Sequence, residues 1–409
     1  MTRPLSDRAL LLLLAAVTAL GPIATNLYLP ALPAVREYFG ASVAAVQATF
    51  SVSLVTFALG LLVWGPISDR YGRRNAVLYG LSIMVVGTIA CLSAQSLHWL
   101  IAGRGLQAFG TATGLVTARA IVADLYPTER MAKLFASLTM VAVLGNSLAP
   151  VLGGFVAAGL GWRAIFATLM LATLVVGAIA WRRLPETRRA GVRPPRAAEM
   201  LATTWSLARD PQFAGCVLQG AVVYATFLVF ISLAPYMMVS ALGRPATEFG
   251  FYYLFIAAGY FLGNWSVGRL MARRDLHWMV VAGVLLTVAG SGAALGFAAL
   301  GLKHPLWIFI PMGVLAFGQG LALPNVTATA VSRSPEHAGV ASSLIGFLQQ
   351  MIGAICVQLM GHFPTDTPLP SLIFCTSACA IGLAMLYVFP RVDLRGPHAL
   401  PPAPPSAGS

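Results

Sequence analysis

Charged residues are scarce in this sequence. Only 10% of its 409 residues are Asp, Glu, Lys or Arg, whereas 58% are hydrophobic. A water-soluble domain carries roughly a quarter charged residues, so this scarcity excludes a water-soluble fold. The 40 glycines, the 26 prolines and the apolar runs that recur from Leu10 to Phe389 instead favour many membrane-crossing helices packed against one another.

Catalytic and nucleotide-binding patterns are also missing. The sequence contains no GxxxxGKS or GxxxxGKT loop to hold phosphates, no HExxH and no GxSxG. No segment outside the apolar runs is long enough for a nucleotide-binding domain. We therefore expect no enzyme, no direct use of ATP and no cofactor, which leaves transport driven by a gradient or passive transport.

Cysteine is the third scarce feature. The five cysteines lie within apolar segments, without CxxC spacing or a nearby histidine: Cys91, Cys216, Cys356, Cys375 and Cys379. They are typical of small core residues, so we expect neither disulfides nor a metal site.

Twelve apolar segments predict an all-α membrane protein built from two pseudo-symmetric bundles of six transmembrane helices. The predicted spans are Ala9–Pro33, Ala45–Ile67, Ala76–Ala94, Trp99–Val122, Leu134–Ala158, Ala164–Trp181, Phe213–Val239, Gly250–Leu270, Trp278–Leu300, Leu306–Val331, Ala338–Met360 and Leu372–Phe389. The predicted domains are an N-terminal bundle at 1–183, a cytoplasmic linker at 184–209, a C-terminal bundle at 210–390 and a disordered cytoplasmic tail at 391–409. Two such repeats around a central site are typical of transporters.

The distribution of basic residues predicts the orientation. The formal net charge is +13, which in a soluble protein would suggest nucleic-acid binding. Here Arg and Lys gather on one side of the predicted spans, and only Arg36, Arg163, Arg244 and Lys303 fall on the other side. This positive-inside bias predicts a multi-pass protein of the bacterial inner membrane, with both termini in the cytoplasm and no nucleic-acid partner.

The loop after the second span, GPISDRYGRR at 65–74, combines a helix break with one acid and three bases. It resembles the signature loop of the major facilitator superfamily. The resemblance implies that Asp69 and Arg73 pair with Asp124 at the end of the fourth span and latch the outward-facing state. The alternative is that the bases only follow the positive-inside rule.

The fifth span carries small residues at four-residue spacing, with a proline among them. Gly145 and Gly153 share one helix face, and Pro150 removes a backbone hydrogen bond. The segment GNSLAPVLGG, which ends at Gly154, resembles the antiporter motif of the superfamily, with Ala149 where glycine is usual. Ordinary close packing of membrane helices is the alternative.

Arg104 lies a few residues into the fourth span, where an ionised group is costly unless it is paired or faces water. The segment RGLQAFG at 104–110 resembles a superfamily motif, which implies that Arg104 faces the cavity and takes part in proton or substrate coupling. The alternative is that Arg104 extends along the helix to the nearby membrane interface.

The first span ends in NLYLPALP at 26–33, which closely resembles the Bcr/CflA branch of drug exporters. The segment ARAIVADLY, with Arg119 and Asp124, and LPET at 184–187 extend the resemblance across the first half. That branch usually carries an acid at the position of Asn26, where it would be the natural proton carrier. In this sequence no acid falls in the middle of a predicted span.

Two hypotheses follow from the missing acid. Asp124 could carry protons, coupled through Arg119 and Arg104, while Asn26 only forms hydrogen bonds with substrate. Alternatively, Arg104 could bind an acidic substrate directly. The candidate cavity residues are polar or aromatic residues within spans, each of which could equally form an interhelical hydrogen bond: Asn26, Tyr28, Gln107, Asn146, Tyr224 and Gln349.

Together these features predict a monomeric inner-membrane transporter that exports drug-like small molecules from cytoplasm to periplasm in exchange for protons. A largely apolar cavity with few polar groups suits amphipathic cargo. The alternatives are an exporter of an endogenous metabolite, such as a siderophore or an amino acid derivative, and a membrane sensor or scaffold that transports nothing.

Overall fold

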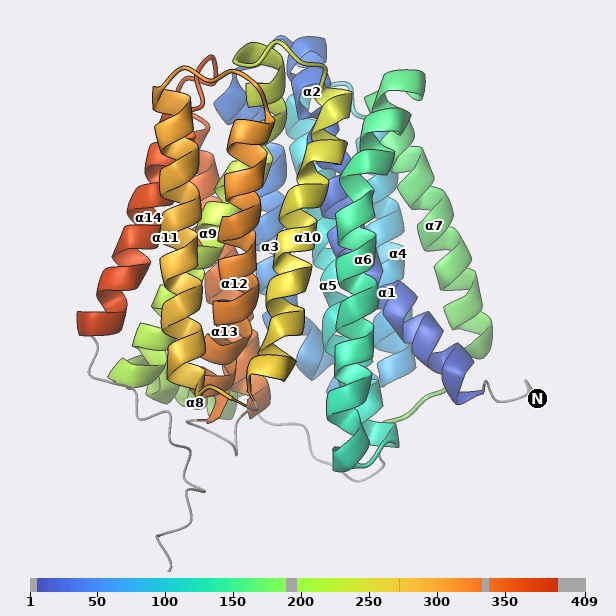
Figure 1. The fold of residues 1–409 in the computed structure, drawn as a ribbon. Coiled ribbons are helices and arrows are strands. Elements are labelled where there is room, and N and C mark those ends of the chain that lie inside the picture. Colours follow the sequence, from blue (N-terminus) through green and yellow to red (C-terminus); the bar gives the residue numbers. More distant parts are fainter. Residues whose placement is uncertain (1–5, 189–196, 272, 333–337, 389–409) are drawn as a thin grey trace, which may run out of the picture.

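The computed structural model describes residues 6–188, 197–271, 273–332 and 338–388. The predicted tail at 391–409 lies outside the described residues. Within these ranges the regular structure is helical, as the composition predicted. The helices stand roughly side by side (Figure 1), and their ends define two faces. We name these faces the α8 end, where α1 begins, and the α2 end.

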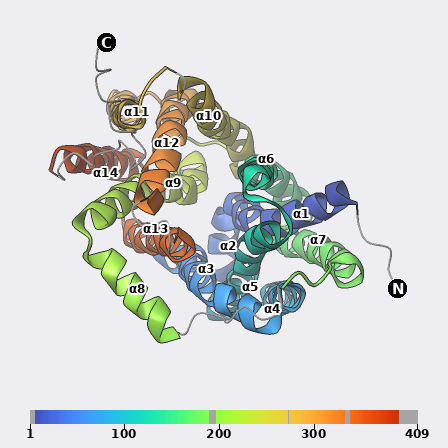
Figure 2. The same ribbon diagram turned by 90° about the horizontal axis from the view of Figure 1, so that it is seen from below.

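Two groups of helices make up the molecule (Figure 2). The first contains α1 (Asp7–Tyr28), η1 (Leu29–Ala31), α2 (Leu32–Phe39), α3 (Val43–Tyr71), α4 (Arg73–Leu92), α5 (Leu97–Leu125), α6 (Thr128–Leu160) and α7 (Trp162–Arg183). The second contains α9 (Pro211–Ser240), η2 (Ala246–Glu248), α10 (Phe249–Leu270), α11 (Leu276–Ala299), α12 (Leu306–Ser332), α13 (Ala338–Met360) and α14 (Leu369–Val388). The two groups meet along α3 and α13 and along α6 and α10.

The expected linker contains a helix that the sequence analysis did not predict. Helix α8 (Ala197–Arg209) lies at the periphery of the α8 end (Figure 2) and packs on α9 and α13. The first span also continues past its predicted end at Pro33. Pro30 and Pro33 occupy first-turn positions of η1 and α2, where a missing N–H is tolerated, so the chain remains helical to Phe39.

Ten segments of the described chain are long and apolar enough to cross a membrane. The two remaining predicted spans correspond to α5 and α10, which are helices of comparable length. Helix α5 buries Arg104, Gln107 and several threonines, and α10 contains three tyrosines and Asn264. Neighbouring helices surround these polar groups, so a bundle helix can carry them at lower hydropathy than a helix surrounded by lipid.

Small residues set the distance between α1 and its neighbours. A Cβ atom at Gly153 of α6 would lie 2.0 Å from the backbone oxygen of Leu27, and one at Gly114 of α5 would lie 2.4 Å from that of Val17. Both distances are too short for real atoms. Glycine is therefore required for the backbones of α5 and α6 to approach α1 this closely.

We expect Gly153→Ala to destabilise the protein by roughly 1–3 kcal/mol, because the added methyl group must push α6 away from α1. The measurement is thermal unfolding of the purified protein in detergent. Gly159→Ala on the same helix is the control, since a Cβ there meets nothing within 4 Å. Equal unfolding temperatures for the two variants would contradict the close approach.

Candidate functional site

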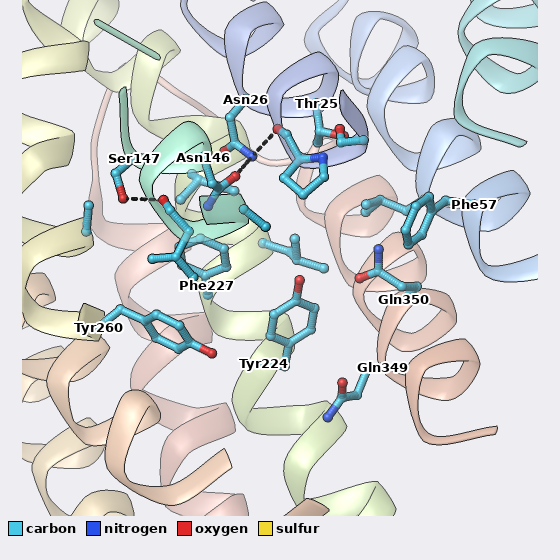
Figure 3. Close-up of a pocket in the computed structure, with 18 of the residues that line it drawn as sticks. Thr25, Asn26, Phe57, Asn146, Ser147, Tyr224, Phe227, Tyr260, Gln349 and Gln350 are labelled. Atoms are coloured by element: carbon cyan, nitrogen blue, oxygen red, sulfur yellow. Dashed lines mark hydrogen bonds between the residues drawn. The ribbon is translucent and has the colours of Figure 1, made fainter. Parts of the chain in front are cut away.

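A cavity of about 340 Å³ lies between the two groups of helices. Most of its surface is apolar, with aromatic side chains such as Phe57 and Phe227 among polar groups (Figure 3). Four of the six candidate cavity residues line it: Asn26, Asn146, Tyr224 and Gln349. Gln350 on α13, another polar residue within a predicted span, lines it as well.

Asn26 and Asn146 join α1 to α6 at the cavity wall (Figure 3). The side-chain nitrogen of Asn26 donates to the backbone oxygen of Pro22 at 3.0 Å and also to the side-chain oxygen of Asn146. The nitrogen of Asn146 in turn donates to the hydroxyl of Tyr253 on α10 at 3.4 Å. This row of neutral groups therefore continues from the first bundle into the second.

Tyr28 and Gln107 do not line the cavity, which corrects their assignment as cavity residues. Tyr28 lies within 3.1 Å of Thr49, and Gln107 donates to Thr88 at 2.8 Å. The physical reason is helix rotation: Tyr28 faces α3 and α7, and Gln107 faces α4, all inside the first bundle.

Arg104 belongs to the same buried group and is also absent from the cavity lining. Its side chain is 1% exposed, so it does not extend to the membrane interface. One terminal nitrogen donates to Gln107 at 2.5 Å and to the backbone oxygen of Ala24 at 3.2 Å, and the guanidinium lies 4.7 Å from the ring centre of Tyr28. Carbonyl oxygens and a π face thus stabilise this cation.

Arg119 lines a second, smaller cavity of about 110 Å³. The two cavities share four lining residues, which places them next to each other: Pro22, Phe57, Leu115 and Ala142. The Arg119 side chain makes no hydrogen bond or ion pair with the rest of the described chain. Arg119 therefore lines a cavity that adjoins the main one.

At the α8 end, the structure brings Asp69, Arg73 and Asp124 together. Arg73 donates to Asp124 at 2.9 Å, pairs with Asp69, and donates to the hydroxyl of Ser68 at 2.7 Å. These groups lie on α3, α4 and α5. The cluster therefore connects three helices of one bundle.

The antiporter-like segment lies where α6 meets both α1 and the second bundle. A Cβ atom at Gly145 would lie 3.0 Å from Ile23, whereas one at Gly154 would lie 3.1 Å from the backbone oxygen of Thr247 in η2. Pro150 is buried, and its oxygen would lie 2.8 Å from a Cβ at Gly250 of α10. Gly145, Pro150, Gly153 and Gly154 thus place α6 at a junction between the bundles.

Glu186 holds the start of α4, a contact that the sequence analysis did not predict. Its carboxylate accepts hydrogen bonds from the backbone N–H groups of Arg73 at 2.9 Å and Arg74 at 3.3 Å, at the start of α4. Gly72 has φ +97°, and a Cβ there would lie 2.3 Å from the carboxylate. An anion at a helix N-terminus satisfies free N–H groups and complements the helix dipole. The LPET segment was part of the family resemblance, but it did not predict that Glu186 contacts the start of α4.

Direct contacts between the bundles gather at the α2 end. Ser51 on α3 donates to Gln358 on α13 at 2.7 Å, and Gln358 donates to the backbone oxygen of Ala44 at 3.1 Å. Gln47 donates to the backbone oxygen of Ser232 on α9 at 3.0 Å. These uncharged contacts close the α2 side of the cavity.

We expect Glu186→Gln to destabilise the start of α4 by about 1 kcal/mol, because a neutral amide is a poorer acceptor at a helix N-terminus. Hydrogen exchange at the amides of Arg73 and Arg74 should become faster. Glu37→Gln, an identical change at an exposed residue of α2, is the control. Unchanged exchange at these amides would contradict the capping role.

Known proteins match the sequence of this chain over most of its length. Residues 14–357 match the Major Facilitator Superfamily. The chain is 26% identical to a bicyclomycin resistance protein homolog of Haemophilus influenzae, covering 93% of this chain and 95% of that protein. It is 29% identical to multidrug resistance protein D of Escherichia coli (87% and 89%) and 28% identical to a chloramphenicol resistance protein of Pseudomonas aeruginosa (95% and 92%).

Solved structures share the fold at lower identity. The crystal structure of a D-xylose-proton symporter superposes with a TM-score of 0.76 at 15% identity, covering 95% of this chain and 99% of that one. A peptide transporter solved in complex with sulfate gives a TM-score of 0.78 at 17% identity, covering 94% of each chain. With its helical bundles, its central cavity and a sequence match over most of its length, this chain belongs to the major facilitator superfamily of membrane transporters.

Proposed function

We propose that this transporter exports drug-like small molecules from the cytoplasm to the periplasm across the bacterial inner membrane, in exchange for protons. The observation that carries the proposal is the largely apolar cavity at the junction of the two bundles. A cavity of this size and character suits amphipathic small molecules. The relatives named for resistance to bicyclomycin, chloramphenicol and multiple drugs support cargo of this kind.

The proposed direction follows from the distribution of charge. Arg70, Arg73, Arg74 and Arg188 gather at the α8 end. By the positive-inside rule this supports a cytoplasmic α8 end, and we propose that both termini are cytoplasmic. The contacts at the α2 end then close the cavity toward the periplasm. We infer an inward-facing state that takes cargo from the cytoplasm.

Alternating access requires the two bundles to move against each other. We propose rigid units at 1–183 and 210–390, joined by a linker at 184–209 that includes α8, in a protein that works as a monomer. The Asp69–Arg73–Asp124 cluster stays within one bundle, so it connects α3, α4 and α5 to one another while Asp124 is ionised. Because these ion pairs are formed in the inward-facing state that we infer, they do not by themselves supply the latch on the outward-facing state that the sequence resemblance implied.

Asp124 is the proposed proton carrier. It is only 16% exposed at its side chain and is paired with Arg73, so protonation would release that arginine. Arg119 lies on the same helix, between Asp124 and Leu115, which lines the cavity. This position suits a coupling role. The geometry does not favour direct binding of an acidic cargo by Arg104, because Arg104 is buried away from the cavity lining.

We expect Asp124→Asn to abolish cargo-induced release of protons from the lumen of inverted membrane vesicles. A neutral amide cannot bind and release the transported proton. The measurement is recovery of a pH-sensitive dye when chloramphenicol is added to energised vesicles. Asp366→Asn, at an exposed residue of the α2 end, should behave as the unaltered protein. Full proton release by Asp124→Asn would remove Asp124 as the carrier.

We expect cross-linking of the α2 end to block transport. In a Ser51→Cys/Gln358→Cys variant, a short thiol-reactive linker with a cleavable disulfide should hold α3 against α13 and prevent opening. Reduction of the linker should restore transport, and the two single variants should be unaffected by the reagent. Undiminished transport in the cross-linked protein would contradict opening at this end.

A further inference from the structure

Among the residues that the structure describes, no charged side chain lines the cavity between the bundles. Its polar groups are amides, phenols and hydroxyls, and the rest of the wall is apolar. An ion that entered this cavity would lose most of its hydration without gaining a counter-ion, which is unfavourable inside a membrane. The lining therefore favours an uncharged cargo.

Within the described residues, two positively charged side chains lie close to the cavity. Arg119 lines the adjoining small cavity, and Arg104 holds the backbone oxygen of Ala24, two residues before Asn26. In the part of the chain that the structure describes, the carboxylates lie near helix ends or in connecting segments. The resulting field raises the free energy of a cation in the cavity further than that of a neutral molecule.

Asn26 presents a hydrogen-bond acceptor that is not used. Its nitrogen must face Pro22, because the backbone oxygen of Pro22 only accepts, and this fixes the orientation of the amide. The side-chain oxygen of Asn26 is then left without a partner, although the residue is 5% exposed. A buried acceptor of this kind requires a donor from water or from a ligand.

Gln350 presents a second unused acceptor from the opposite bundle. Its side-chain oxygen is buried without a partner, and the residue lines the same cavity (Figure 3). Both oxygens are covered in this conformation, so the side chains must rotate before water or a cargo donates to them. When the bundles close around a cargo that excludes this water, the cargo itself must provide the donors.

We propose that the cavity selects uncharged cargo that has N–H or O–H donors beside an apolar or aromatic part, and that it rejects organic cations. The donors bind Asn26 on one bundle and Gln350 on the other, while Phe57 and Phe227 contact the apolar part. This assignment rests on the proposed export function and specifies its substrate class. Asn26 is the residue that determines whether a charged cargo is accepted.

Binding to the purified full-length protein in detergent tests the proposal without a proton gradient. The probes are radiolabelled chloramphenicol, which is uncharged and carries two hydroxyls and an amide N–H, and tetraphenylphosphonium, a permanent cation without donors. We expect the unaltered protein to bind chloramphenicol at least about tenfold more tightly than tetraphenylphosphonium. Comparable affinities, or no binding of chloramphenicol, would overturn the proposal.

Two substitutions at Asn26 test separately its hydrogen-bond acceptor and its lack of charge. Asn26→Leu should weaken chloramphenicol binding by about tenfold, as expected for one lost hydrogen bond, and leave tetraphenylphosphonium binding unchanged. Asn26→Asp should create tetraphenylphosphonium binding at pH 8. Asn264→Asp, on α10 outside the cavity lining, is the matched control and should not create it. Chloramphenicol binding unaffected by Asn26→Leu would overturn the role of Asn26.

Failure of this proposal is distinguishable from failure of proton-coupled export. Proton release from inverted vesicles tests coupled transport whatever the charge of the cargo, whereas the binding measurements report the cavity alone. Tight binding of tetraphenylphosphonium together with cargo-induced proton release would overturn the substrate class and leave the export function in place. The unfolding temperature of the Asn26→Leu variant verifies that the variant is folded.

Discussion

The free-energy cost of holding charge inside a low-dielectric bilayer governs where this protein places its ionisable groups. The Asp69–Arg73–Asp124 cluster lies at the α8 end, and Glu186 caps a helix there. Deep within the first bundle, Arg104 is stabilised by Gln107, a backbone oxygen and the ring of Tyr28 instead of a carboxylate. The described lining of the cavity between the bundles consequently carries no charged side chain.

An uncharged interface is suited to repeated opening and closing. In the described residues, the hydrogen bonds between the bundles join amides, hydroxyls and backbone oxygens, such as those of Ser51 and Gln358, whereas Arg73 forms its ion pairs within one bundle. A neutral hydrogen bond contributes about 1 kcal/mol, and water replaces it when it breaks. Breaking a buried ion pair costs more. Ion pairs thus hold helices of the first bundle together, and weaker contacts join the two bundles.

The sequence predicted the helices well because apolar length and charge placement are local signals. The span expected at Ala338–Met360 coincides with α13, and that at Phe213–Val239 differs from α9 by a few residues at its ends. Helix α8 was missed because its amphipathic segment lies in an Arg- and Pro-rich stretch. Helix α2 was missed because Pro33 was taken as a stop, although proline fits the first turn of a helix.

The site was predicted only in part, because one sequence does not show which helix face meets which neighbour. Asn26 and Asn146 line the cavity as expected, but their hydrogen bond joins positions 120 residues apart. Tyr28 and Gln107 look equally suitable in sequence, yet the rotation of their helices directs them into the first bundle. Glu186 was recognisable within its motif, whereas its partners at the start of α4 depend on tertiary structure.

The most direct test that the cavity opens alternately at its two ends is a pair of distances between spin labels. One pair, at Tyr71 and Met271, reports the α8 end, and the other, at Glu37 and Phe363, reports the α2 end; these residues are exposed. On addition of chloramphenicol, the α8-end distance should shorten in part of the population while the α2-end distance lengthens in an equal part. Two unchanged distances, or changes in the same direction, would contradict the account.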